Sequence, residues 1–94
     1  MLTLYQAEWC PFSHRVRARL TELEVPFVAM QVEPRPEDRD ELRDAAGADS
    51  IPVLLTEDGE AIAGADRIVA WLDDTYAEPP SARGHRAQAR AHRV

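Results

Sequence analysis

The stretch Trp9-Cys10-Pro11-Phe12-Ser13-His14-Arg15 holds the single cysteine of the chain at the start of a predicted helix. Pro11 suits the first helical position, because its missing N–H would be unpaired there in any case. A thiolate at Cys10 would face the free N–H groups of the first turn and the positive end of the helix dipole. Both favour the anion over the thiol, so the sequence predicts a reactive cysteine rather than an inert one.

Four short apolar segments around this stretch predict β-strands. The second of them, residues 26–32, is mostly apolar and is expected to be buried on both faces. Asp58-Gly59 separates the last two segments and is a strong signal for a tight hairpin, so those strands should pair antiparallel. The predicted strands cover residues 2–5, 26–32, 51–55 and 60–63.

Three further segments predict helices and complete the element order β-α-β-α-β-β-α. The first helix begins at Pro11 and is stopped by Pro26. The second is short and weakly apolar, and Gly47 is suited to close it in a left-handed conformation. The third follows residues 64–66 and carries one apolar stripe. The apolar face of the first helix is expected to hold Phe12, Val16, Leu20 and Leu23.

Charge divides the 94 residues into two parts. Residues 1–77 carry 16 acidic residues and 7 arginines, whereas residues 78–94 carry 1 acidic residue and 4 arginines. The acidic first part argues against nucleic acid as the main partner, because duplex binding depends on basic side chains that contact phosphates. The second part contains prolines, a glycine and no apolar period. We therefore expect one domain over residues 1–77 and a disordered basic tail over residues 78–94.

The composition also indicates where such a chain would work. No segment approaches the roughly 20 apolar residues that span a bilayer, and the first residues lack the layout of a signal peptide. One cysteine cannot form an internal disulfide, so any disulfide would be transient and made with another molecule. We expect a cytoplasmic protein that is not associated with a membrane.

Three markers, in this order along the chain, carry a resemblance to a known family. Cys10-Pro11-Phe12-Ser13 is similar to a C-P-x-C or C-P-x-S active site, Ser50-Ile51-Pro52 to a pre-proline segment, and Gly64-Ala65-Asp66 to a G-x-D helix entry. Together they make residues 1–77 resemble the glutaredoxin and glutathione S-transferase N-terminal domain family. The resemblance implies an α/β thioredoxin-like (glutaredoxin-type) fold with a four-stranded mixed sheet flanked by helices. In the transferases a helical domain usually follows this one. The 94 residues hold no such domain after residue 77, so we expect a freestanding glutaredoxin-like module.

The resemblance implies thiol–disulfide oxidoreductase activity of the monothiol type. Cys10 would be the nucleophile that attacks a mixed disulfide between a protein and glutathione. Ser13 stands where a dithiol enzyme has its resolving cysteine, so a second glutathione would have to release Cys10. His14 lies four residues after Cys10, where it would hydrogen-bond the thiolate or shuttle a proton, unless it faces solvent.

The resemblance also implies a groove for glutathione or another small thiol as co-substrate. Pro52 would be a cis proline, and the backbone of Ile51 would pair with the cysteinyl unit of the tripeptide. Ala65 and Asp66 would hold the γ-glutamyl end through helix N–H groups and a carboxylate. The remaining predicted contacts of the co-substrate come from Pro11 and Phe12 beside the nucleophile.

The resemblance is incomplete at one charged position. Ala7 stands where many glutaredoxins have a lysine, and Arg15, Arg35 or Arg39 would have to replace its charge on the glycyl carboxylate. Trp9 is either an exposed docking surface for target proteins or packs against the proline loop. The expected partners are a small thiol and protein disulfides or glutathionylated proteins. We expect a monomer or weak dimer without a metal site.

Two alternatives remain open from the sequence. The first is a non-catalytic, transferase-like module that keeps the fold and binds other proteins. An ordinary pKa at Cys10 would favour it. The second is an iron–sulfur cluster carrier, as in similar monothiol glutaredoxins with a C-G-F-S motif. Pro11 in place of that glycine and Ala7 in place of the lysine make this the least favoured hypothesis.

Overall fold

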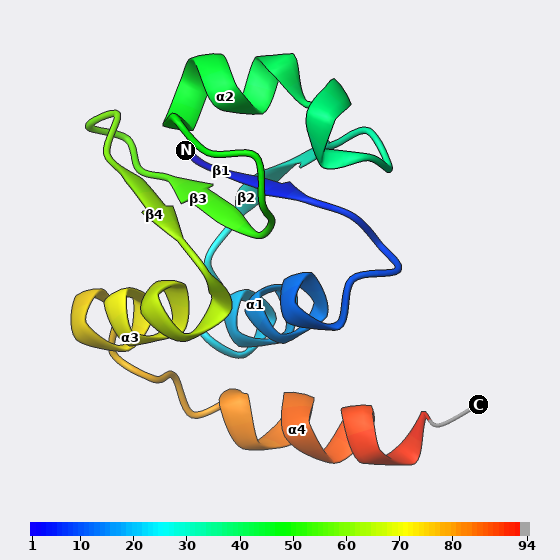
Figure 1. Ribbon diagram of the computed structural model, residues 1–94. Coiled ribbons are helices and arrows are strands. Elements are labelled where there is room, and N and C mark those ends of the chain that lie inside the picture. The colour runs from blue at the N-terminus through cyan, green and yellow to red at the C-terminus, as the bar shows by residue number, and fades with distance from the viewer. Residues whose placement is uncertain (93–94) are drawn as a thin grey trace.

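A computed structural model describes residues 1–92 and shows a four-stranded sheet between helices (Figure 1). The strands are β1 (Leu2–Gln6), β2 (Phe27–Gln31), β3 (Val53–Leu55) and β4 (Ala61–Ala63), in the spatial order β2-β1-β3-β4. β1 is parallel to β2 and antiparallel to β3, and β3 is antiparallel to β4. The predicted mixed sheet and the predicted hairpin at Asp58-Gly59 are confirmed.

Helices cover both faces of this sheet (Figure 1). α1 (Pro11–Glu22) and α3 (Ala65–Thr75) lie on one face, and α2 (Asp40–Ala46) lies on the other after a single 3-10 turn, η1 (Pro36–Asp38). Successive residues of β1 point to opposite faces, so Leu4 packs toward α1 and α3 whereas Tyr5 packs toward α2. Gly47 closes α2 at a φ of 67°, as predicted.

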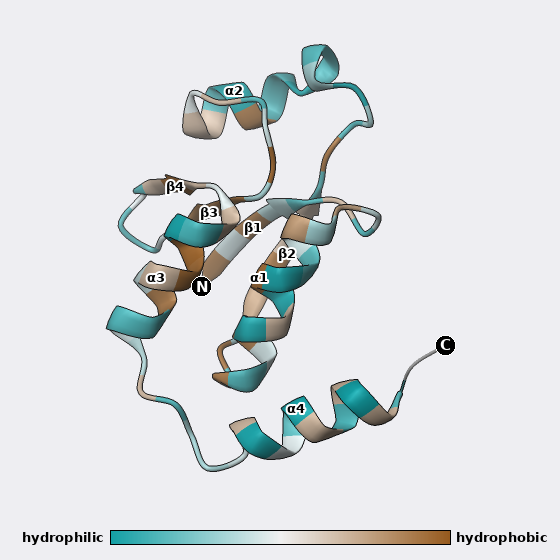
Figure 2. Cartoon of the chain, turned by 60° about the horizontal axis from the view of Figure 1, so that its bottom comes forward, coloured by the Kyte–Doolittle hydropathy of each residue, from teal (hydrophilic) through white to brown (hydrophobic). Residues whose placement is uncertain are grey.

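The larger of the two cores lies between the sheet and the pair α1 and α3. Figure 2 shows hydrophobic residues concentrated in the strands and in α3, whereas α1 combines hydrophobic and hydrophilic residues. Val16, Leu20 and Leu23 of α1 are buried there, as the helical spacing predicts. Phe12 is not part of this apolar face, because it lies in the first turn of α1 beside a groove, and its side chain is 62% exposed.

The prediction that β2 is buried on both faces is wrong. The sheet order places β2 at an edge, where β1 is its one neighbour, and Val28 is 45% exposed. An apolar run indicates that a segment forms a strand. It does not indicate whether the strand is central or at an edge of the sheet, because that depends on pairing with distant segments.

The segment expected to be a disordered tail contains a helix instead. α4 (Ala82–Ala91) lies along α1 on the side away from the sheet (Figure 1), and Ala82 is fully buried. Figure 2 shows that α4 is largely hydrophilic. This explains why the spacing of apolar residues in the sequence did not predict the helix. The last two residues of the predicted tail, 93–94, lie outside the described residues, and the domain boundary at residue 77 remains a prediction.

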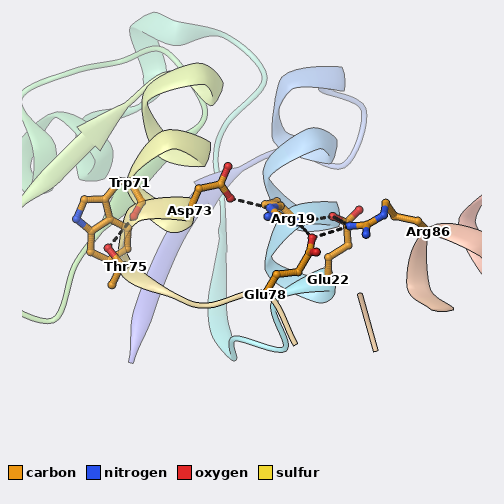
Figure 3. A network of polar contacts seen from close by, with 7 residues as sticks. All are labelled: Arg19, Glu22, Trp71, Asp73, Thr75, Glu78 and Arg86. Carbon is orange, nitrogen blue, oxygen red and sulfur yellow. Dashed lines mark hydrogen bonds and ion pairs between the residues drawn. The ribbon is translucent and has the colours of Figure 1, made fainter. Parts of the chain in front are cut away.

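Ion pairs join α4 to the rest of the fold (Figure 3). Arg19 of α1 contacts Asp73 of α3 at 2.8 Å and Glu78, in the segment before α4, at 2.9 Å. Arg86 of α4 contacts Glu78 at 2.8 Å and Glu22 of α1 at 3.4 Å. Two arginines and three carboxylates thus connect three helices, and Glu78 lies between both cations.

We expect this network to make the docking of α4 sensitive to acid. Arg86 and Arg19 lower the pKa of Glu78 from its ordinary 4.5 to about 2. A carboxyl group whose pKa is lower in the folded state stabilises that state above its unfolded pKa, and the contribution disappears as the pH falls through the folded pKa. We expect the urea midpoint to fall between pH 4.5 and pH 2, and to fall less in Glu78→Gln. Glu41→Gln, outside the network, should behave like the wild type, and an equal fall in all three proteins would contradict the prediction.

Candidate functional site

Cys10 lies at the junction between β1 and α1 and caps the helix. Its backbone N–H donates to the Ala7 carbonyl at 3.1 Å, which closes the turn that leads from the strand. Its Sγ accepts a hydrogen bond from the Ser13 N–H at 3.4 Å, in the manner of a helix N-cap side chain. The thiol is therefore directed at the free N–H groups of the first turn, and Cys10 is 5% exposed.

The surroundings of Cys10 favour the thiolate. Burial has the largest single effect and raises the pKa of the thiol. The Ser13 hydroxyl, the N–H groups of Ser13 and Phe12, and the charge of Arg17 act in the opposite direction, and the net pKa lies below its ordinary value. The predicted activation of Cys10 thus has a physical basis in hydrogen bonds at the start of α1.

Ser13 acts on the Cys10 sulfur more directly than its position in the C-P-x-S motif indicates. Its side chain is fully buried, and within residues 1–92 its Oγ makes no hydrogen bond of ordinary geometry. The hydroxyl is thus free to turn toward the neighbouring thiolate, which is consistent with its effect on the pKa of Cys10. Ser13 cannot resolve a disulfide, but it can stabilise the attacking and leaving forms of the Cys10 sulfur.

His14 and Pro11 lie on the outer side of this turn. Both side chains are exposed, and the backbone N–H of His14 donates to the Cys10 carbonyl at 3.0 Å. In the described part of the chain, no hydrogen bond joins the His14 ring to the sulfur. A proton-shuttle role for His14 and a co-substrate contact for Pro11 remain predictions.

A groove of about 400 Å³ brings together most of the predicted co-substrate residues. The Ile51-Pro52 peptide bond is cis, and the Gly64 N–H donates to the Pro52 carbonyl at 3.0 Å, which joins this loop to the start of α3. Segments far apart in the sequence therefore form a continuous wall. Its predicted members are Phe12, Ile51, Pro52, Ala65 and Asp66.

The N-terminus of α3 lines part of the groove. Gly64 precedes the helix at a φ of 94°, a conformation that favours glycine, and α3 starts at Ala65. The N–H groups of its first turn have no intrahelical partners, and the helix dipole adds partial positive charge there. This arrangement suits a carboxylate or another small anion.

The charged side chains of the groove differ from the sequence prediction. Asp66 is paired with Arg15, which joins α3 to α1 across the groove. Arg15 is thus the one candidate cation of the three that lines the groove, since Arg35 pairs with Asp38 and Arg39 is directed into the loops beside α2.

Arg67 is a groove residue that sequence reasoning missed. It follows Asp66 in the first turn of α3 and lines the groove, together with Ala63. Within residues 1–92 it makes no ion pair or side-chain hydrogen bond, so its charge is available to a ligand. The sequence feature that could have identified it is its position directly after the Gly64-Ala65-Asp66 marker.

Two exposed aromatic residues lie close to Cys10 in the sequence. Trp9 is 65% exposed and Phe12 is 62% exposed, which favours the docking hypothesis for Trp9 over packing against the proline loop. Among residues 1–92, no helix is long and apolar enough to cross a membrane. The same residues contain no group of three or more His, Cys, Asp or Glu side chains that could hold a metal ion.

Comparisons with known proteins agree with this geometry. A family model described as "Glutathione S-transferase, N-terminal domain" matches residues 9–75. Rice GST1 in complex with glutathione is 28% identical at a TM-score of 0.70, and the match covers 96% of this chain and 42% of that one. A Methylobacillus flagellatus glutathione S-transferase with glutathione bound is 25% identical at a TM-score of 0.70, over 96% and 46% of the two chains.

A third structure shares the fold at lower identity. Glutaredoxin 2 from Salmonella typhimurium, in complex with glutathione, is 17% identical at a TM-score of 0.69, over 98% of this chain and 44% of that one. The thioredoxin-like fold is thereby confirmed. The chain spans less than half the length of each of these three structures. No curated protein matches it.

Proposed function

Because the chain belongs to the glutathione S-transferase N-terminal domain family, we propose that it is a monothiol oxidoreductase that acts on mixed disulfides of proteins with glutathione. The observation that carries the proposal is the placement of Cys10, whose thiol has a lowered pKa at the start of α1. The glutathione in the rice and Methylobacillus structures supports this choice of small thiol over another. We place the activity in the cytoplasm, where small thiols keep cysteines reduced.

The proposed reaction has two steps. In the first, the Cys10 thiolate attacks the glutathione sulfur of the mixed disulfide, and the protein leaves as a thiolate that takes up a proton. In the second, the thiolate of another glutathione attacks the glutathione sulfur bound to Cys10. This step releases oxidised glutathione and restores the Cys10 thiolate. The glutathione supplies the two electrons that reduce the protein disulfide, so no other reductant is needed.

The groove would orient glutathione for both steps. The backbone of Ile51 would pair with the cysteinyl unit, and the first turn of α3 would hold the γ-glutamyl carboxylate. Arg67, which makes no ion pair within residues 1–92, brings positive charge to a ligand with two carboxylates, which partly offsets the acidic character of the chain. The ammonium group would share the Asp66 carboxylate with Arg15.

The pH dependence of Cys10 alkylation tests this proposal. The rate of reaction with iodoacetamide is measured across the pH range, and the intact mass is measured after incubation with oxidised glutathione. We expect a midpoint below the free-cysteine value of about 8.5, together with a glutathione adduct. In Ser13→Ala the midpoint should move upward, because the thiolate loses a hydrogen-bond donor.

Ser81→Ala is the matched control, since the exposed Ser81 makes no side-chain cap at α4 and should leave the midpoint unchanged. A midpoint near that of free cysteine, without an adduct, would overturn the oxidoreductase proposal. That result would favour a module that binds proteins through the exposed Trp9 and Phe12.

A further inference from the structure

Arg39 is a buried cation that the proposed reaction does not use. It precedes α2 and is 4% exposed, yet within residues 1–92 no carboxylate pairs with it. A buried guanidinium is costly unless its N–H groups are hydrogen-bonded. The groups that accept the hydrogen bonds of Arg39 therefore indicate its role in the fold.

The guanidinium of Arg39 donates to three backbone carbonyls. Its Nε contacts the Glu33 carbonyl at 2.8 Å, and Nη2 contacts the Pro34 carbonyl at 2.9 Å, both in the loop after β2. Its Nη1 contacts the Asp49 carbonyl at 2.8 Å, in the loop between α2 and β3. One side chain thus connects two loops on the α2 side of the sheet (Figure 1).

The loop that contains Asp49 continues into the wall of the groove. Ile51 and Pro52 follow Asp49 by two and three residues, and both line the groove beside Phe12. Among residues 1–92, no backbone group of residues 48–51 takes part in a hydrogen bond to other backbone. Within residues 1–92, the bond from Arg39 to the Asp49 carbonyl is therefore the one hydrogen bond that holds the backbone of this loop before Pro52, whose own carbonyl is held by Gly64 at 3.0 Å.

We infer that Arg39 is a positioning residue for small-thiol binding: it holds the Asp49 carbonyl and thereby sets the place of Ile51 in the groove. The inference rests on the proposed function, in which the Ile51 backbone pairs with glutathione. Arg39 acts on the ligand through the loop and not through its own charge. Cys10 is held by its own bonds to Ala7 and Ser13, so its reactivity does not depend on this loop.

Lysine cannot replace arginine in this role. The three carbonyls are contacted by three different guanidinium nitrogens, whose N–H groups a rigid planar group directs outward in fixed directions. A lysine ammonium is a single point of charge, so Arg39→Lys keeps the charge but leaves carbonyls without donors. Arg43→Lys is the matched control: Arg43 donates to the Pro36 and Glu37 carbonyls of the 3-10 turn, and it reaches Asp49 through an exposed ion pair of 3.7 Å.

The test separates ligand binding from thiol reactivity. The dissociation constant for S-methylglutathione, which cannot form a disulfide with Cys10, is measured by calorimetry for the wild type, Arg39→Lys and Arg43→Lys. We expect binding about tenfold weaker in Arg39→Lys, as for the loss of one hydrogen bond to a charged group, and unchanged binding in Arg43→Lys. The rate of Cys10 alkylation by iodoacetamide should be the same in all three proteins.

Amide hydrogen exchange at Gly64, whose N–H donates to the Pro52 carbonyl at the end of this loop, gives a second readout that needs no ligand. Faster exchange in Arg39→Lys than in Arg43→Lys supports the positioning role. Equal exchange in the two variants would overturn the positioning role. Weaker binding together with slower alkylation in Arg39→Lys would also overturn it, and either result would indicate a general structural role for Arg39. If the wild type does not bind S-methylglutathione, the proposed function fails, and the exchange rates still decide the role of Arg39. If Arg39→Lys is unfolded by circular dichroism, Arg39→Gln is measured in the same way.

Discussion

Cys10→Ser is expected to lose all glutathione-dependent reduction of mixed disulfides, down to the rate of the uncatalysed reaction. The chain has no second cysteine that could take over the attack or form the intermediate. A serine hydroxyl stays protonated near neutral pH and cannot form a disulfide, so neither step of the proposed reaction remains. The loss should exceed about a thousandfold, as is usual when a covalent nucleophile is removed. The assay is the reduction of a glutathionylated peptide coupled to the consumption of glutathione.

The fold and the groove should survive this change. Serine has nearly the volume of cysteine and is among the preferred N-cap residues, so α1 should remain capped. The variant should therefore unfold at the wild-type urea concentration and still bind S-methylglutathione. Ser81→Ala serves again as the control and should keep full activity. A Cys10→Ser protein that still reduces the peptide would show that the chemistry lies elsewhere.

Among the proposed variants, Leu20→Ala is expected to cause the largest loss in the free energy of unfolding. Leu20 lies on the inner face of α1, is fully buried, and packs in the core between the sheet and α3. The smaller side chain loses buried apolar area and leaves a cavity, at a cost of about 3 kcal/mol in the free energy of unfolding. Domains of this size have about 5–15 kcal/mol in total, so the loss is a large fraction. Urea denaturation measures it directly.

Val28→Ala provides the matched comparison on the edge strand. Val28 is exposed on β2, so the same kind of truncation should cost less than about 1 kcal/mol. Equal losses for the two variants would contradict the assignment of Leu20 to the core and of β2 to the edge.

The local features of the site could be predicted from the sequence. Cys10 followed by Pro11 indicates a capped helix start, and Gly47 and Asp58-Gly59 mark the end of α2 and the hairpin. The five predicted groove residues Phe12, Ile51, Pro52, Ala65 and Asp66 lie together, although family resemblance rather than spacing selected them. Capping, turn conformation and helical spacing act over a few residues, so they leave a pattern in the sequence.

Other features could be decided only by the tertiary structure. The order of strands places β2 at the edge, and ion pairs with Glu22 and Glu78 join α4, which has no large apolar side chain, to the rest of the fold. The partner of Asp66 is Arg15, 51 residues away, and Arg39 binds carbonyls in two separate loops. A charged residue in a sequence does not show its partner, because long side chains pair with whatever the folded backbone brings within a few ångströms. The amino-acid sequence by itself therefore determined where Cys10 and its helix lie, whereas the folded chain decided which charged side chains pair at the groove.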